Sequence, residues 1–303
     1  MRRKLEENWL RLVRFYTFNT PISKGKYRLF QAALRFCKLE HKSLVGRSKD
    51  RRHFSVNLTT GMQEHVYFFG EYEKVLSRIA SKLINSGDVC IDVGANFGWY
   101  TTLMAELCGH TGEVHAFEPV PQSYRELAKN YALSGSPENV FINELALGDR
   151  EGVVSINIFD GEPTGHASIA AKGDSGFASF ECRVTTLDDY LVRNCIRDVN
   201  FVKVDIEGAE MMFLLGAERL FSQEKPPVFL MEMALAQTSH FGYTPNDLIK
   251  FIATRGDYEF FAVDEARSKL IRIEQFNDDD IGANVFCIPR HVSLGPISKL
   301  IEN

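Results

Sequence analysis

The sequence predicts a doubly wound α/β fold with a mostly parallel sheet, preceded by a helical extension. Between residues 89 and 142, short apolar runs alternate with helix-spaced segments, which gives a βαβαβ series. The same alternation resumes at residue 201, whereas residues 1–52 show helical spacing without such runs. Parallel strands need long return connections, and crossover helices supply them, so this order predicts a parallel sheet covered by helices on both faces.

Residues 1–52 are expected to form a basic helical extension. They carry 15 Lys+Arg against 4 Asp+Glu, while the rest of the chain carries 20 against 36. This asymmetry predicts either a segment with its own anionic partner or a segment that packs on the acidic body. We expect no nucleic-acid partner and keep peripheral membrane contact through this segment open. The helical spacing is that of Leu5, Trp9, Leu12, Val13 and Tyr16.

Residues 53–303 are expected to form one α/β domain with an insertion. Alternating residues near 154–158 and 180–184 predict a β-hairpin-like insertion at about 149–185, with a glycine-rich connector. Helices are expected at 71–83, 99–108, 122–133 and 209–221 and after Pro245. Strands are expected at 89–93, 114–117, 140–142, 201–205, 228–233, 258–263 and 284–288.

The sequence predicts neither a membrane-spanning protein nor a secreted one. No run approaches the roughly 18 apolar residues that cross a bilayer, and the N-terminus has no continuous apolar segment of a secretory signal. The six cysteines are scattered without a C-x-x-C pair, as is typical of reduced core thiols. We therefore expect a cytoplasmic location, with contact at the inner face of the membrane as an open alternative.

The first two strands of the βαβαβ series end in residues suited to a nucleoside. Gly94 and Gly98 let a ligand approach the backbone where the next helix begins. Glu118 ends the second strand, 24 residues after Gly94, where a carboxylate can accept hydrogen bonds from both ribose hydroxyls. Taken singly, the glycines could form only a tight turn and the acid only a helix cap. Their order on adjacent strands favours a nucleoside site.

Asn96 indicates which nucleoside fits. A dinucleotide site requires G-x-G-x-x-G, and Asn96 stands where its second glycine belongs, so pyrophosphate is poorly matched. S-adenosylmethionine fits better, with the turn backbone, including Ala95, and Asp92 serving its amino-acid end and Glu118 its ribose. Acidic strand ends also suit a cationic sulfonium. An NAD-dependent oxidoreductase remains the alternative enzyme.

Three acidic residues follow the later strands. A reaction at this edge of the sheet that removes a proton needs a base, and Asp205 and Glu207 are the candidates. The alternatives are that Asp205 positions a ligand and that Glu207 caps the next helix. Glu232 is expected to contact substrate or to join the other two around a divalent cation. The spacing matches no recognised metal motif, so we predict no metal.

Two residues of the glycine-rich connector are further candidates. His166 could act as a base because imidazole titrates near neutral pH, and Ser168 could contact substrate if the connector closes as a lid. The alternative is that His166 is an inert loop residue.

Six ordered blocks make the sequence recognisable. They are residues 89–102 (VCIDVGANFGWYTT), 115–119 (HAFEP), 143–148 (NELALG), 186–190 (TLDDY), 203–210 (KVDIEGAE) and 284–289 (NVFCIP). Together these blocks resemble the FkbM family of methyltransferases, and the resemblance covers about residues 70–290.

The resemblance implies a class I, Rossmann-like, S-adenosylmethionine-dependent fold whose seven-stranded sheet has an antiparallel last strand. It implies O-methylation of a hydroxyl on a sugar, polysaccharide, glycolipid or polyketide. Gly94, Asn96 and Gly98 resemble the family's cofactor turn, Glu118 its ribose acceptor, and Ala146 a residue bordering adenine. The extension lies outside the resemblance, and a non-catalytic scaffold or membrane-surface module remains the non-enzyme alternative. Oligomeric state is left open.

Overall fold

The computed structural model describes residues 2–20, 24–36, 43–58, 62–159, 177–277 and 282–302. The chain divides into two compact units, one of residues 1–74 with 129–135 and one of residues 75–128 with 136–303. The boundary between the two units therefore lies near residue 74, whereas the charge distribution predicted a boundary at residue 52. The reason is a hairpin, because strands β1 (Ser43–Arg47) and β2 (His53–Asn57) pair antiparallel across residue 52.

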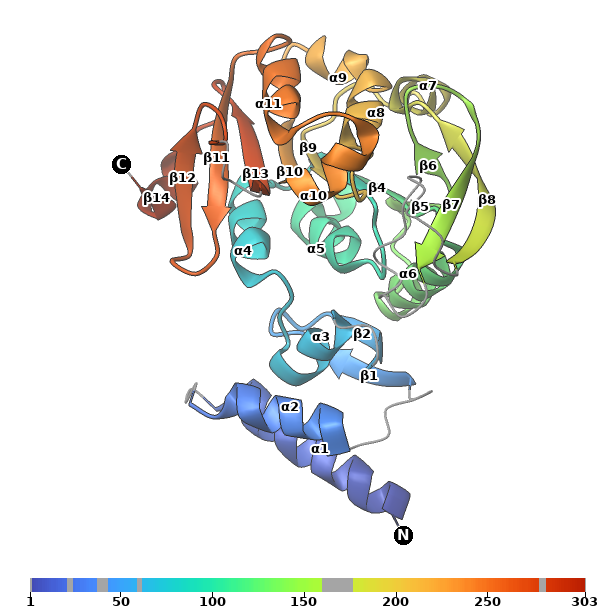
Figure 1. Ribbon diagram of the computed structural model, residues 1–303, viewed down its shortest axis with the longest axis vertical. Coiled ribbons are helices and arrows are strands. Elements are labelled where there is room, and N and C mark those ends of the chain that lie inside the picture. The colour runs from blue at the N-terminus through green and yellow to red at the C-terminus, as the bar shows by residue number, and fades with distance from the viewer. Residues whose placement is uncertain are drawn as a thin grey trace. The chain divides into compact units, whose positions relative to one another are not determined.

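The first unit is built on two helices that lie side by side, α1 (Arg2–Asn19) and α2 (Lys26–Phe36) (Figure 1). Both pack on α3 (Gln63–Phe69). Thr17 of α1 donates a hydrogen bond to the carbonyl oxygen of Phe68, and the ring centroid of Phe30 lies 5.4 Å from that of Phe68. Thus the helical extension exists, and its core is shared with α3.

The second unit contains a nine-stranded sheet in the order β14-β12-β11-β13-β10-β9-β3-β4-β5. Strands β5, β4, β3, β9 and β10 are parallel, and β13 is antiparallel to both β10 and β11. The strands are β3 (Val89–Val93), β4 (Glu113–Phe117), β5 (Val140–Asn143), β9 (Phe201–Val204), β10 (Val228–Ala234), β11 (Tyr258–Asp264), β12 (Lys269–Ile273), β13 (Gly282–Pro289) and β14 (Ile301–Glu302).

The doubly wound α/β class is confirmed, and the strand number needs a correction. The seven expected strands, with an antiparallel β13 between β10 and β11, form the body of the sheet. Strands β12 and β14 extend one edge beyond the expected seven. They were missed because β12 is a five-residue strand in which basic residues interrupt the aliphatic ones, and β14 has only two residues.

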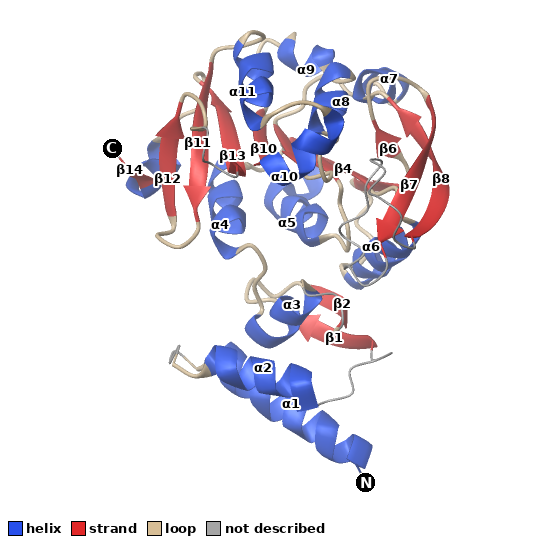
Figure 2. Ribbon diagram, in the orientation of Figure 1, coloured by secondary structure: helices blue, strands red, loops and turns tan. Residues whose placement is uncertain are grey.

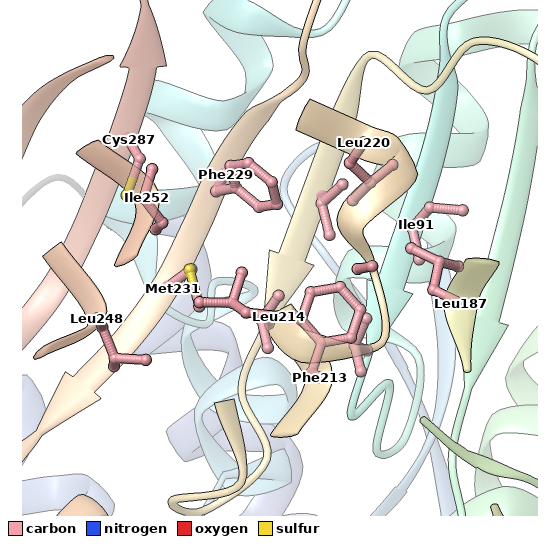
Figure 3. Close-up of a cluster of buried hydrophobic side chains, with 14 of the residues drawn as sticks. Ile91, Leu187, Phe213, Leu214, Leu220, Phe229, Met231, Leu248, Ile252 and Cys287 are labelled. Carbon is pink, nitrogen blue, oxygen red and sulfur yellow. The ribbon is translucent and has the colours of Figure 1, made fainter. Parts of the chain in front are cut away.

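Helices cover both faces of this sheet. Figure 2 shows α4 and α5 on one side and α8 and α11 on the other. On the second side, Phe213 and Leu214 of α8 and Leu248 of α11 join Phe229 and Met231 of β10 in one buried apolar cluster (Figure 3). The helices are α4 (Lys74–Leu83), α5 (Trp99–Cys108), α6 (Pro121–Leu133), α7 (Leu187–Arg193), α8 (Glu210–Leu215), α9 (Glu218–Phe221), α10 (Leu235–Thr238) and α11 (Pro245–Ala253).

A small sheet occupies the region where the insertion was expected. Strands β7 (Gly152–Phe159) and β8 (Phe177–Thr185) pair antiparallel, and β6 (Ala146–Leu147) pairs parallel with β8. The two candidate residues of the connector, His166 and Ser168, lie outside the described residues. Within the described ranges, no helix has the length and apolar character of a membrane span.

Candidate active site

A left-handed turn follows β3 at the carboxyl edge of the sheet. Gly94, Asn96 and Gly98 have φ angles of +78°, +51° and +89°. Glycine adopts this conformation without the penalty that a side chain adds. A Cβ on Gly94 would lie 1.9 Å from the carbonyl oxygen of Asp205. The turn after β3 is therefore packed directly against the end of β9, and position 94 has no room for a side chain.

Gly94→Ala is expected to destabilise the protein by about 3 kcal/mol, because the strain of a positive φ adds to the collision with Asp205. Gly242→Ala is the matched control, since Gly242 also has a positive φ of +80° but a Cβ there meets nothing within 4 Å. The control should cost only about 1 kcal/mol. Urea unfolding of both variants measures the difference. Equal losses would mean that the turn can move away from β9.

Glu118, directly after β4, is tied to this turn. Its side chain is 4% exposed, and its carboxylate accepts hydrogen bonds from the backbone N–H of Asn96 at 2.7 Å and of Val120 at 2.8 Å. Burial raises the pKa of Glu118 to about 7, against the opposing effect of the two backbone donors. A carboxylate has about four acceptor positions, so roughly two remain for other donors.

Asp92 is fully buried on β3 beside the same turn. One carboxylate oxygen accepts a hydrogen bond from the Thr101 hydroxyl at 2.6 Å, and the other, Oδ1, has no hydrogen-bond partner among the described residues. Burial raises the pKa of Asp92, and the positive charge of Lys203 opposes this shift. A buried acceptor without a donor is costly, so Oδ1 is a natural acceptor for a donor on a ligand.

Lys203 lies between Asp92 and Asp205, and it was not among the predicted site residues. It lies on β9 directly beside Asp92 in the strand register and is 6% exposed. Its ammonium group donates to Asp205 Oδ2 at 2.9 Å and lies 5.0 Å from the ring centroid of Tyr100. A lysine inside a strand whose four residues are all buried was the signal that could have identified it.

The three acids of the later strands come together. Carboxylate oxygens of Asp205, Glu207 and Glu232 lie within 4.8 Å of one another. Burial, followed by the charges of Asp205 and Glu207, raises the pKa of Glu232 to about 9. Such a cluster can share a proton or ligate a divalent cation. The ion pair of Asp205 with Lys203 already places a positive charge beside the cluster, which favours proton sharing.

The turn that carries Glu207 is held by a neighbouring acid. Glu210 is 1% exposed and accepts hydrogen bonds from the backbone N–H groups of Ile206 and Gly208, each at 3.2 Å. The Tyr243 hydroxyl also donates to Glu210 at 3.2 Å. Helix α8 has no side-chain hydrogen bond at its N-cap. Glu210 therefore binds backbone donors of this turn.

Ala146 lies on the small sheet. It is buried in a cluster with Ile156 and Cys182. Burial raises the pKa of the Cys182 thiol, and the charge of Glu118 makes a smaller contribution in the same direction. Ala146 and its neighbours are thus within electrostatic range of Glu118.

The topology and the turn together define the class of protein. In the seven-stranded body of the sheet one strand, β13, is antiparallel to the others. A glycine turn follows the first strand and an acid follows the next, which is the Rossmann-like fold of class I methyltransferases. A sequence model described as the methyltransferase FkbM domain matches residues 92–260, which is more than half of the chain. The chain belongs to the FkbM methyltransferase family.

Several solved structures are similar to this chain. A methyltransferase FkbM from Methylobacillus flagellatus is 14% identical, with 93% of this chain and 58% of that protein covered and a TM-score of 0.43. A SAM-dependent O-methyltransferase from Thermotoga maritima is 13% identical, with coverage of 82% and 78% and a TM-score of 0.41. A TehB-like SAM-dependent methyltransferase from Corynebacterium glutamicum is 9% identical, with coverage of 71% and 87% and a TM-score of 0.39. Among curated proteins, none matches this chain.

Proposed function

We propose that the protein is an S-adenosylmethionine-dependent O-methyltransferase whose acceptor is a hydroxyl of a sugar, polysaccharide, glycolipid or polyketide. The observation that supports this most is the hydrogen bond from the Asn96 backbone to Glu118. It joins a hydroxyl-accepting carboxylate to the glycine turn, and the same turn packs against Asp205. Family membership supports the proposed acceptor class.

The residues at the strand ends fit the cofactor. The remaining acceptor positions of Glu118 suit the two hydroxyls of a ribose. Oδ1 of Asp92, which has no partner among the described residues, suits a ligand ammonium group. S-adenosylmethionine, when bound, supplies a methyl group on a positively charged sulfur, and the acidic surroundings favour that charge.

Asp205 is the base in this proposal. The acceptor hydroxyl loses its proton to Asp205 as the new oxygen–carbon bond forms and the carbon–sulfur bond breaks. Lys203 holds one oxygen of Asp205 and thereby orients the carboxylate. Glu232 carries its own proton at neutral pH and acts as a hydrogen-bond donor to the acceptor or to Glu207. The enzyme otherwise contributes alignment of the two reactants.

Glu118→Ala tests the cofactor site. The variant should bind S-adenosylhomocysteine about 1.5–3 kcal/mol more weakly than the wild type, because charge-assisted hydrogen bonds to the ribose are lost. Isothermal titration calorimetry measures the affinity, and thermal unfolding shows whether the variant is folded. Glu138→Gln, which removes an exposed acid, is the control and should bind normally.

Unchanged affinity in the Glu118 variant would remove Glu118 from the cofactor site. Mass spectrometry of cofactor retained through purification distinguishes the main alternative, because a nicotinamide dinucleotide would indicate an oxidoreductase. If the wild type binds neither ligand, the non-catalytic alternative gains support.

A further inference from the structure

Helix α1 has two apolar faces, and only one of them is used in folding. Leu10 and Val13 are buried at 1% and 2% exposure. Leu5, Trp9 and Leu12, spaced i, i+4 and i+7, lie on another face and are 61%, 39% and 64% exposed. A helix that packs on one side needs a single apolar stripe and normally keeps its other face polar. The second stripe therefore has a purpose other than the core of this unit.

Two further large aromatic side chains of the N-terminal helices are also exposed. Phe15 of α1 is 66% exposed and Tyr27 of α2 is 62% exposed. Among the described residues, twelve large apolar side chains are strongly exposed, and five of them lie on these two short helices. Exposed apolar groups scattered singly need no explanation, but a concentration of this kind marks an interaction site. We call these five residues, Leu5, Trp9, Leu12, Phe15 and Tyr27, the exposed apolar surface.

The charge of the same helices is strongly positive. Residues 2–36 contain nine Lys or Arg and two acids. Arg11 and Arg28 are exposed, and each is adjacent in sequence to a member of the exposed apolar surface. Large apolar side chains combined with basic residues are the pattern of helices that lie in the interface of an anionic membrane.

We propose that α1 and α2 dock on an anionic phospholipid bilayer, with the exposed apolar surface inserted between the headgroups. A helix of 18 residues is about 27 Å long, enough to lie flat along the interface with all four of its exposed apolar residues in contact. This inference uses only the first unit and is independent of the proposed function.

Charge and side-chain chemistry argue against two other occupants. A second copy of this chain would bring two strongly basic helix pairs together, and their repulsion opposes such a dimer. A nucleic acid would be bound by the basic residues and by aromatic stacking, but Leu5 and Leu12 offer neither. Aliphatic side chains that are more than half exposed favour lipid over both.

Flotation of the full chain with phosphatidylcholine vesicles, with and without phosphatidylglycerol, tests the proposal. We expect binding to the anionic vesicles and little to the neutral ones. Brominated lipid should quench Trp9, whereas Trp99, 4% exposed, serves as the internal reference. Failure to bind anionic vesicles, or quenching that spares Trp9, would overturn the proposal.

The double variant Leu12→Gln/Phe15→Gln separates insertion from simple charge attraction. We expect it to lower the membrane partition coefficient at least about tenfold, because two inserted side chains become polar. Val153→Gln/Val192→Gln is the matched control, since these valines of the second unit are 61% and 57% exposed. Equal effects of the two double variants would contradict the proposal.

Reversing the charge of two arginines is the second test of the proposal. Arg11→Glu/Arg28→Glu should weaken binding to anionic vesicles at least about tenfold. Two outcomes would assign the surface to another partner and overturn the lipid proposal. One is tight, salt-sensitive binding to a DNA duplex that the Leu12/Phe15 variant retains. The other is a stable dimer of the wild type, seen by analytical ultracentrifugation, that the same variant disperses.

Discussion

Asp205→Asn is expected to slow methyl transfer roughly 100- to 10,000-fold while cofactor affinity stays nearly unchanged. An amide cannot take the hydroxyl proton, but it has nearly the shape of the carboxylate and can still accept a hydrogen bond from Lys203 through its oxygen. The measurement is the initial rate of S-adenosylhomocysteine release with an acceptor alcohol from a glycan or polyketide screen. Calorimetry with S-adenosylhomocysteine gives the affinity of the same variant.

Asp198→Asn is the control for this prediction, because Asp198 is an exposed acid before β9 and should be replaceable without effect. Full activity in the Asp205 variant would exclude it as the base. A parallel loss of rate and of cofactor affinity would assign Asp205 a positioning role, in keeping with the packing of its backbone against Gly94. In that case Glu207 becomes the remaining candidate for the base.

The sequence was sufficient to predict which strand ends come together. Strands β3, β4 and β9 are mostly apolar and almost entirely buried, so their ends are visible in the sequence. Gly94, Glu118 and Asp205 each follow such a run. Since the carboxyl ends of parallel strands meet at one edge, the convergence of these three residues could be derived before any contact was known.

The pairing of charges within the site could not be predicted. Lys203 is more than 100 positions from Asp92 in the chain, and their adjacency depends on the register of β3 against β9. A shift by one residue would turn Lys203 to the opposite face of the sheet. The role of Glu210 could not be predicted for a related reason, because its side chain folds back onto the turn that precedes it in the chain.

Glu232→Gln is expected to change how stability depends on pH. The folded protein holds a proton on Glu232 up to about pH 9, whereas an unfolded glutamate, with the ordinary pKa of 4.5, releases it far earlier. The folded state therefore binds more protons than the unfolded state between these values, and stability falls as pH rises through this window. Glutamine stays neutral, so the variant should lose less stability, by about 2 kcal/mol between about pH 7 and pH 9.

Stability measured above pH 7 separates the contribution of Glu232 from those of the other buried acids of the site. Glu118 and Glu210 have pKa values raised to about 7, so most of their effect on the pH dependence of stability falls below pH 7. Titrating groups away from the cluster act alike in variant and wild type and cancel in the difference between their urea unfolding curves. Glu138→Gln, an exposed substitution, should leave the pH dependence unchanged. Parallel curves for Glu232→Gln and the wild type would show that Glu232 ionises normally, and the proton-sharing arrangement of the three carboxylates would then be wrong.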